Sequence, residues 1–451
     1  MNEKIKKKPS PTRIIIGSFA LIILIGALLL MLPFSSAKGE CTSPVDAFFT
    51  ATTATCVTGL VTVDTFSHWS TFGHGVILAL IQIGGLGLIT LTTFFLVSLR
   101  KKAGLSNMVL AREAVGSNDI SSLKGLVMLV IIFSFTVELI GAALLSIRFV
   151  PMFGIGKGIW ISVFTAISAY CNAGIDLFGQ ISPFSSLTTF DNDPLINLTV
   201  MALIIIGGLG FIVYYDLLFS RKRRGHFMLH TRIVLIATLV LVLSGLVLFL
   251  LFEWGNNATL GSFDTAGQKT LAAAFHSVST RTAGFNTVSI ADLTAPSKLL
   301  TVVYMFIGAA PGSTAGGVKV TTVVVIMAAV IATLKGSDDV VIMNRKISQG
   351  VIYKAISLVL IGLLIAVIST AVVYTTNDVS LLDASLETVS ALGTVGLSTG
   401  ITPSLSLVSK IVIMLTMFLG RVGPFTFFIA FSAKADKNKV VVLPEGEIIV
   451  G

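Results

Sequence analysis

The sequence predicts an all-α integral membrane protein built from four repeats, each a membrane span, a short pore helix, a re-entrant loop and a second span. Three observations predict this fold class. The 451-residue chain is 54% hydrophobic and only 12% charged, whereas soluble domains carry about 25% charged residues. Apolar stretches long enough to cross a bilayer recur along it. Short Gly-containing segments lie between them at a regular spacing. Eight transmembrane helices and four re-entrant loops are therefore expected around one central pore.

The first repeat is assigned to residues 14–102, behind a short cytoplasmic N-terminus at 1–13. Residues 14–34 form an apolar stretch of about 21 residues, enough to cross the roughly 30 Å hydrocarbon core as a helix. No small-residue cleavage site follows, so we interpret this stretch as a membrane helix rather than a signal peptide. Residues 45–53 are too short to span and precede a loop, after which residues 76–99 form the second span.

The same succession is expected three more times, in residues 103–224, 225–346 and 347–433, before a cytoplasmic C-terminal tail at 434–451. The remaining expected spans are 126–149, 195–219, 233–252, 299–331, 351–374 and 408–431. The remaining expected short helices are 159–168, 268–277 and 381–390.

Glycines mark the repeats at two places. The first set lies in the loops after the short helices and comprises Gly59, Gly174, Gly284 and Gly396. Subtracting their positions gives spacings of 115, 110 and 112 residues. A second set follows 24 to 33 residues later and comprises Gly84, Gly207, Gly308 and Gly420. Two registers that share one period indicate internal repeats.

The distribution of charge predicts the orientation. The net charge is +9, and the basic clusters 4–8, 100–102, 221–224 and 434–439 lie beside apolar spans. That placement is typical of cytoplasmic loops, so nucleic acid is not an expected partner. We expect a multi-pass protein of the plasma membrane, in contact with the lipid bilayer, with both termini cytoplasmic. The acidic residues of the outer loops either form a vestibule that concentrates cations or are ordinary polar loop residues.

The loops carry the functional prediction. Non-helical backbone at membrane depth is tolerated where it is buried in protein or lines a watery cavity. Thr394-Val395-Gly396 is similar to the loop whose carbonyl oxygens replace the hydration shell of potassium. Glycine permits the backbone that this requires, and the C-terminal ends of the short helices favour a cation. The alternative is four ordinary re-entrant turns.

The residues whose carbonyls are expected to bind potassium form four segments, here called the first to fourth glycine loops: Val57, Thr58, Gly59, Leu60; Asn172, Ala173, Gly174, Ile175; Thr282, Ala283, Gly284, Phe285; and Thr394, Val395, Gly396, Leu397. Arg281, just before the third loop, is expected to brace it. The three cysteines form no CxxC pair, so neither a disulfide framework nor a zinc site is indicated.

The expected span 299–331 is interrupted at residues 308–318, where small residues and a proline cannot form a stable straight helix. The segment predicts either a flexible intramembrane gate or a kinked helix packed through small residues. The candidate gate residues are Gly308, Pro311, Gly312, Ser313, Thr314, Ala315, Gly316 and Gly317. Lys319, just after them, is expected to snorkel or to pair with an acid.

Arg421 lies deep in the last expected span. A charge at that depth is costly and indicates function. It follows Gly420 of the second register, so we expect it to project toward the axis beneath the loops. The alternative is a structural ion pair with an acid such as Glu138 or Asp216. Glu138 itself is expected to brace neighbouring spans.

These loops and aligned glycines resemble the membrane subunit of the Trk/Ktr/HKT potassium transporter superfamily over nearly the whole chain, and its modest length resembles the Ktr branch. The resemblance implies potassium uptake in a bacterium, a gate at 308–318 and a pore constriction at Arg421. In that family a serine at the first filter glycine is associated with sodium passage, and here Gly59 is present. A less selective sodium/potassium transporter of the same fold is the alternative.

The resemblance also implies partners. It predicts a homodimer on a cytoplasmic ring of nucleotide-binding, RCK-type regulatory subunits, with candidate docking surfaces at 100–112, 221–224 and 448–451. Potassium is the transported ion and the only metal expected, and sodium is a candidate activator. No covalent cofactor and no catalytic residues are expected, because the sequence has no cluster of His, Asp and Glu within an apolar span.

Overall fold

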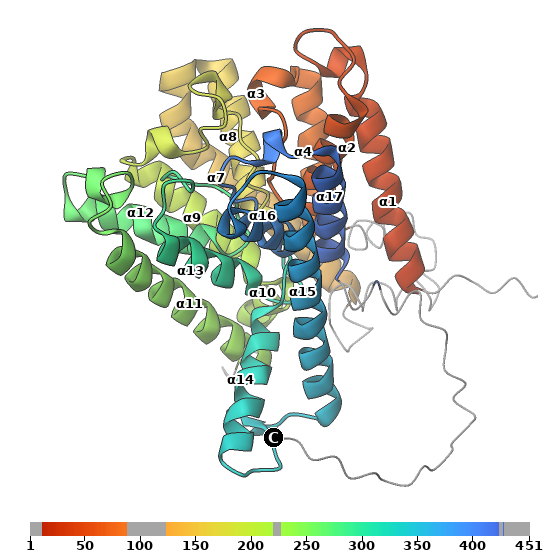
Figure 1. The fold of residues 1–451 in the computed structure, drawn as a ribbon, viewed down its shortest axis with the longest axis vertical. Helices are drawn as coiled ribbons and strands as arrows, with labels where there is room; N and C mark the ends of the chain where they lie inside the picture. Colours follow the sequence, from red (N-terminus) through yellow and green to blue (C-terminus); the bar gives the residue numbers. More distant parts are fainter. Residues whose placement is uncertain (1–10, 88–122, 220–226, 424–426, 428–451) are drawn as a thin grey trace, which may run out of the picture.

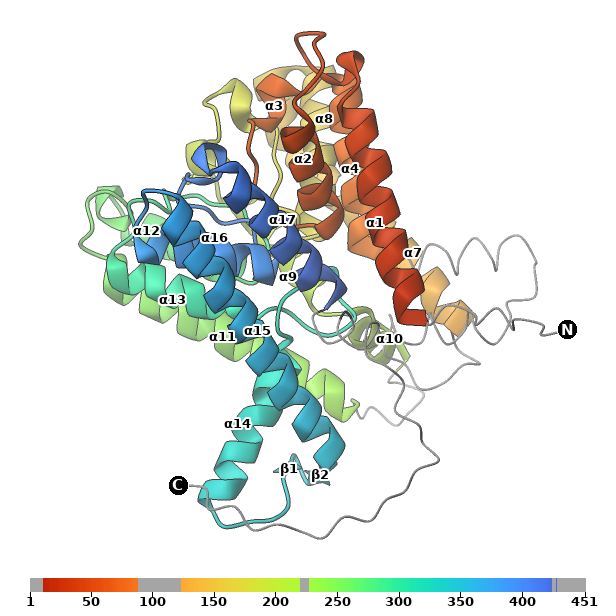
Figure 2. The same cartoon turned by 45° about the vertical axis from the view of Figure 1, so that its right-hand side comes forward.

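A computed structural model describes residues 11–87, 123–219, 227–423 and 427 (Figure 1). In this part of the chain the structure is helical apart from one two-stranded hairpin, β1 (Val341–Ile342) with β2 (Arg345–Lys346), between α14 and α15 (Figure 2). The expectation of a mostly helical protein is confirmed in this coarse form.

Four long helices alternate with short ones along the described chain. The long helices that open each unit are α1 (Pro11–Leu30), α7 (Leu123–Phe153), α11 (Leu229–Glu253) and α15 (Gln349–Thr376). The short helices are α2 (Pro44–Cys56), α8 (Ile155–Tyr170), α12 (Ala266–Ser279) and α16 (Leu381–Gly393). The helices that follow the loops are α4 (Thr71–Leu86), α9 (Pro194–Gly208), α13 (Ala295–Phe306) and α17 (Leu407–Val422). The other helices are η1 (Pro33–Ser35), α3 (Thr65–His68), η2 (Phe178–Gln180), η3 (Thr188–Phe190), α10 (Phe211–Phe219), η5 (Leu260–Ser262), α14 (Val320–Leu334) and η6 (Thr402–Ser404).

Local sequence signals explain where many of these helices begin. The side chain of Ser380 caps α16 by accepting from the Asp383 amide. Thr265 and Gln268 form a capping box at the start of α12. In α2 a proline occupies the first turn, where its missing N–H costs no helical hydrogen bond. The helix starts are therefore encoded within a few residues of each end.

Three described helices are long and apolar enough to cross a membrane: Met128–Phe153, Leu229–Glu253 and Gln349–Thr376. A fourth span results if the bent pair α9 and α10 counts as one. Strongly exposed apolar side chains on the long helices, such as Leu139, Leu251 and Val367, are 71%, 68% and 65% exposed. Apolar surface of this kind is typical of helices that face lipid. The number of eight spans and the strict repeat architecture stay predictions.

The expected span 195–219 is sharply bent at its glycines, Gly207, Gly208 and Gly210, which were expected to let the helix bend. α9 ends at Gly208, α10 begins at Phe211, and the two axes are bent by 91°. The break follows from a long-range contact: the Phe211 amide donates to the carbonyl oxygen of Gly312 at 2.9 Å. Gly210 has a φ of +90°, and a Cβ there would lie 2.7 Å from the carbonyl oxygen of Pro311.

The helices after the loops stop near the second glycine register. α4 has 16 residues, or about 24 Å at 1.5 Å per residue, and it ends before Gly87, whose φ is +78°. α17 likewise ends before Gly423, at +89°. Inside these helices, a Cβ on three register glycines would overlap a carbonyl oxygen at the end of the preceding short helix: Gly84 that of Thr55, Gly207 that of Tyr170 and Gly420 that of Leu392. Glycine is thus what allows each pair of helices to pack so closely.

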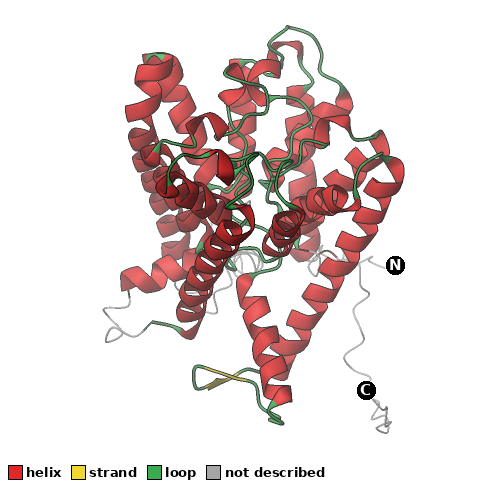
Figure 3. Ribbon diagram, turned by 60° about the vertical axis from the view of Figure 1, so that its left-hand side comes forward, coloured by secondary structure: helices red, strands yellow, loops and turns green. Residues whose placement is uncertain are grey.

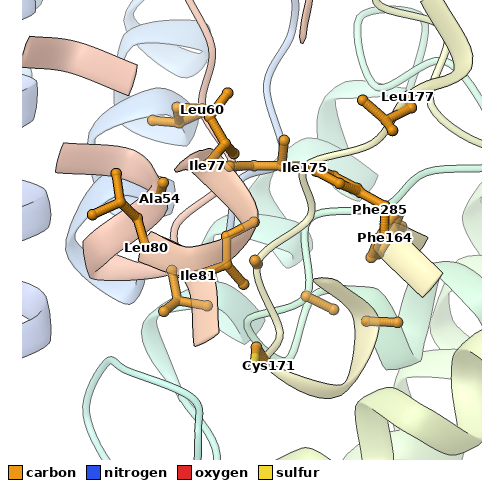
Figure 4. Close-up of a cluster of buried hydrophobic side chains, with 14 of the residues drawn as sticks. Ala54, Leu60, Ile77, Leu80, Ile81, Phe164, Cys171, Ile175, Leu177 and Phe285 are labelled. Carbon is orange, nitrogen blue, oxygen red and sulfur yellow. The ribbon is translucent and has the colours of Figure 1, made fainter. Parts of the chain in front are cut away.

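The largest core cluster joins elements that are far apart in the sequence (Figure 4). Ile77 and Ile81 of α4 pack there with Phe164 and Cys171 of the second unit. Phe285, from the third glycine loop, belongs to the same cluster. The core therefore surrounds and supports the glycine loops.

Candidate functional site

The four glycine loops share one backbone pattern. Each loop begins with a non-glycine residue in the left-handed region and has a second positive φ at its glycine. The angles are +57° for Val57, +59° for Asn172, +68° for Thr282 and +50° for Thr394, and then +101°, +64°, +80° and +94° for Gly59, Gly174, Gly284 and Gly396. Such residues are uncommon outside glycine, and strained backbone concentrates at functional sites.

The glycine loops meet near the centre of the molecule, where the ribbon shows loops converging between helices (Figure 3). Their contacts form a closed ring. A Cβ on Gly59 would lie 2.5 Å from the Ala173 carbonyl oxygen, one on Gly174 2.6 Å from that of Ala283, and one on Gly284 2.5 Å from that of Val395. A Cβ on Gly396 would overlap the carbonyl oxygen of Thr58, which closes the ring. The structure thus brings all four segments together in chain order, with room for glycine alone.

The apolar residue after each glycine anchors the loop in the core. Leu60, Ile175, Phe285 and Leu397 are at most 2% exposed. Because these side chains are buried in the core, the backbone of each loop is the part that faces the other loops. This arrangement suits a site that binds a cation through carbonyl oxygens.

Hydroxyl groups on the short helices brace the glycine loops, and the sequence interpretation did not include them. The amides of Gly59 and Gly396 donate to Thr53 Oγ1 and Ser390 Oγ, each at 3.0 Å. In the second and third loops the hydroxyl is instead the donor, and the acceptor is the carbonyl oxygen of the residue after the glycine. Ser168 Oγ donates to the Ile175 carbonyl oxygen at 2.6 Å, and Ser279 Oγ donates to that of Phe285. The signal was present, because a serine or threonine precedes every loop glycine by five or six residues.

A cavity of about 390 Å³ lies against the ring and is lined by all four loop glycines. Two acids, Asp64 and Asp176, line it as well. Asp64 accepts from the Phe184 amide at 3.0 Å and Asp176 from the Phe178 amide at 2.9 Å. Three other acids of the predicted outer loops form ion pairs instead: Asp46 with Lys410, Asp193 with Arg148 and Asp383 with Lys298.

Asp176 lies in the loop between α8 and η2, outside the long helices. Burial raises the pKa of its carboxyl to about 7, the Phe178 amide opposes this, and the nearby Asp64 carboxylate adds to it. Near neutral pH the cavity therefore carries a carboxyl group that changes charge readily.

The interruption segment, residues 307–319, lies between α13 and α14 and crosses to other units. The Gly308 amide donates to the Val318 carbonyl oxygen at 2.7 Å, which folds the segment back on itself. The Thr314 amide donates to the Gly207 carbonyl oxygen at 3.3 Å. A Cβ on Gly316 would overlap Thr394 Oγ1, so the segment packs directly against the residue that begins the fourth glycine loop.

Arg421 joins the interruption segment to the first unit. Its guanidinium donates to the carbonyl oxygens of Thr314 and Gly84, and to that of Gly85 at 3.4 Å. The alternative acids have other partners: Glu138 accepts from Gln82 of α4 at 3.0 and 3.1 Å, and Asp216 accepts from the Met228 amide. Arg421 is thus held by backbone carbonyls from two other units.

Two further basic residues have defined contacts. Lys319 donates to the carbonyl oxygens of Ala315 and Gly316 at 2.7 and 3.1 Å, and so fastens the end of the interruption segment. Arg281 donates to Thr238 Oγ1 of α11 at 3.2 Å. Among the described residues no group of three His, Cys, Asp or Glu side chains suits a metal ion. The predicted docking surfaces 100–112, 221–224 and 448–451 lie outside the described residues.

Long apolar helices around a ring of glycine loops are typical of membrane transport proteins. Residues 6–442 match the family model TrkH, described as "Cation transport protein", and the chain therefore belongs to this family of ion transporters, which are not enzymes. It is a multi-pass membrane protein.

Curated relatives support the assignment. The chain is 40% identical to Ktr system potassium uptake protein B of Bacillus subtilis, over 98% of this chain and 97% of the relative. It is 37% identical to the potassium/sodium uptake protein NtpJ of Enterococcus hirae, over 100% and 99%. The crystal structure of the potassium transporter TrkH from Vibrio parahaemolyticus shares the fold, with a TM-score of 0.75 and 18% identity over 96% of this chain and 87% of that one.

Proposed function

We propose that this protein takes up potassium across the plasma membrane through the four glycine loops, whose carbonyl oxygens form the selectivity filter. The closed ring of glycine-to-carbonyl contacts is the observation that carries the proposal. The names of the relatives that the chain matches over nearly its full length support potassium as the ion. The test is rubidium uptake in cells that lack their own potassium transport. Absence of uptake by the wild type under all conditions would remove the proposal.

The proposed barrier is the interruption segment together with Arg421. The segment packs against Thr394 at the start of the fourth loop, and Arg421 ties it to the end of α4. A guanidinium beneath a ring of carbonyls repels an approaching cation. Opening of the proposed barrier then requires Thr314 to break its hydrogen bonds with Arg421, Tyr170 and Gly207.

The proposed assembly is a homodimer on a cytoplasmic ring of nucleotide-binding, RCK-type subunits. The resemblance to the Ktr branch supports this assembly, together with 40% identity over 98% of this chain to a Ktr system potassium uptake protein B. Both termini are proposed to be cytoplasmic, and sodium is proposed as an activator.

A second candidate function is less selective sodium/potassium transport. The relative named a potassium/sodium uptake protein, at 37% identity, favours it. The two candidates differ in how strongly sodium competes with rubidium for uptake by the wild-type protein.

Replacing Gly59 by serine is expected to raise sodium permeation relative to rubidium by about tenfold, the effect of roughly 1.4 kcal/mol. The new Cβ would lie 2.5 Å from the Ala173 carbonyl oxygen and must displace the ring. Sodium and rubidium uptake are measured in parallel. Gly75→Ser is the control, because no atom lies within 4 Å of a Cβ at Gly75. An unchanged ratio in Gly59→Ser would contradict the filter assignment.

Uptake is expected to fall as the external pH drops from 8 to 6. The pKa of Asp176 is raised to about 7, so protonation across this window removes a negative charge beside the ring and lowers the local cation concentration. Asp176→Asn should flatten the pH profile, with Asp292→Asn, in another outer loop, as control. A profile that stays steep in Asp176→Asn would assign the effect to another group.

A further inference from the structure

Glu387 is a fully buried carboxyl group in α16, behind the fourth glycine loop. Its Oε1 accepts a hydrogen bond from Thr402 Oγ1. Its Oε2 is buried and has no hydrogen-bond partner within the described part of the chain. A buried carboxyl group is costly unless its few partners are well placed. The position of Thr402 is therefore strongly coupled to that of Glu387.

Thr402 lies in the segment that follows the fourth glycine loop, in η6. Its hydroxyl lies 3.2 Å from Ser398 Oγ, which in turn accepts from the Gly400 amide at 2.9 Å. Ser398 follows Gly396 by two residues, and Ser398, Gly400 and Thr402 all line the cavity. A chain of hydrogen bonds thus runs from Glu387 of α16 through Thr402 to Ser398, two residues after the loop glycine.

The entry to the same loop is fixed separately. Ser390 of α16 accepts from the Gly396 amide at 3.0 Å, so the helix holds the loop through Ser390 from one side and through Glu387 from the other. Hydrogen-bonded networks of this kind rigidify a buried backbone. The contacts through Ser390 and Glu387 together leave the carbonyls of Thr394 to Gly396 little freedom to adjust to a smaller ion.

The other three short helices carry no carboxyl group at the position that corresponds to Glu387. Glu387 stands three positions before the bracing hydroxyl of Ser390, and the residues three positions before the corresponding hydroxyls of Thr53, Ser168 and Ser279 are Thr50, Thr165 and His276, all of them buried. A carboxyl group therefore stands behind one quarter of the ring only, the quarter that carries Thr394-Val395-Gly396.

We propose that Glu387 is a positioning residue that determines ion specificity: through Thr402 and Ser398 it fixes the exit of the fourth glycine loop and hence the place of the Gly396 carbonyl in the ring. This inference rests on the proposed function, because it assigns selectivity to that ring. Glu387 itself does not touch the ion.

The test compares four variants of the full-length protein in cells that lack potassium transport. Glu387→Ala and Thr402→Val are each expected to lower the preference for rubidium over sodium by about tenfold, the scale of a lost buried hydrogen bond. Glu387→Gln retains an oxygen acceptor for Thr402 and should stay within about twofold of the wild type. The double variant Glu387→Ala/Thr402→Val should be no worse than either single one, because both break the same contact.

Asp383→Asn is the matched control. It lies one turn earlier in the same helix, but its carboxylate contacts Lys298 of α13 rather than the loop. It should leave the rubidium/sodium ratio unchanged. A merely structural role would lower the amount of protein in the membrane and both uptake rates together, whereas the proposed role changes their ratio.

Rubidium uptake by the wild type with an unchanged ratio in Glu387→Ala and Thr402→Val would overturn this inference alone. Should Glu387→Ala fail to reach the membrane, an unchanged ratio in Thr402→Val overturns it equally. A tenfold loss in Glu387→Gln, about as large as that in Glu387→Ala, would contradict the hydrogen-bonding role. Absence of rubidium uptake by the wild type would overturn the proposed function, and this inference with it.

Discussion

Gly396→Ala is expected to lower rubidium uptake about 100-fold. Gly396 has a φ of +94°, and a Cβ there would overlap the Thr58 carbonyl oxygen and lie 2.9 Å from the Gly59 Cα. Left-handed backbone costs a residue with a Cβ roughly 1–2 kcal/mol, and overpacking adds about 1–3 kcal/mol. A combined cost near 3 kcal/mol corresponds to about 100-fold in rate.

Gly400→Ala separates the two contributions. Gly400 also has a positive φ, +89°, but no atom lies within 4 Å of its Cβ position. It lines the same cavity, so it reports backbone strain without contact across the ring. We expect a loss of about 5- to 30-fold, because only the backbone cost of about 1–2 kcal/mol applies there. Equal losses in the two variants would mean that the contact between the first and fourth loops does not limit transport.

Arg421→Ala is expected to raise rubidium uptake about tenfold under conditions in which the wild type is largely closed. The substitution removes the hydrogen bonds to Thr314 and Gly84; bonds to a charged donor contribute about 1.5–3 kcal/mol each. It also removes a positive charge from the proposed ion path. Deletion of residues 312–316 should act similarly, because it removes the Thr314 carbonyl. Uptake is measured at equal amounts of membrane-inserted protein.

Arg421→Lys keeps the charge but not the planar fork, so its uptake should lie between those of wild type and Arg421→Ala. Lys410→Ala is the control on the same helix, because Lys410 pairs with Asp46 at 3.6 Å, away from the interruption segment. Uptake by Arg421→Ala at or below the wild-type rate would argue that the arginine supports the fold instead of blocking the path.

The glycine loops could be located from the sequence because their signal is local and repeated. The short helices were predicted to within a few residues, since caps and glycines define both ends. The residues of the loops could be named, but not the order of their contacts. That Gly59 meets Ala173 while Gly396 meets Thr58 depends on how the four units close around an axis, which no single period reveals.

What the sequence could not show are contacts between distant segments. The glycines near Gly208 allow a bend, but they do not reveal its sharpness, because the partner that fixes it is Gly312, about a hundred residues later. An acidic partner was the alternative for Arg421, but its acceptors in the structure are main-chain oxygens of Thr314, Gly84 and Gly85, which the sequence cannot identify. The hydrogen bond from Thr402 to Glu387 joins two side chains 15 residues apart, and neither residue type alone predicts that contact.

The early ends of α4, α9, α13 and α17 have a consequence for how the protein opens locally. Their backbone hydrogen bonds all stop near the second glycine register. Local unfolding of a segment beyond that point therefore need not unfold the helix before it. α14, beyond the interruption, has only Val320 and Ala332 buried, whereas α16 is buried through most of its length. Segments with few buried contacts open at low free energy. We therefore expect amide hydrogens around the glycine ring to exchange slowly as one unit, while those of α14 exchange rapidly and independently of it.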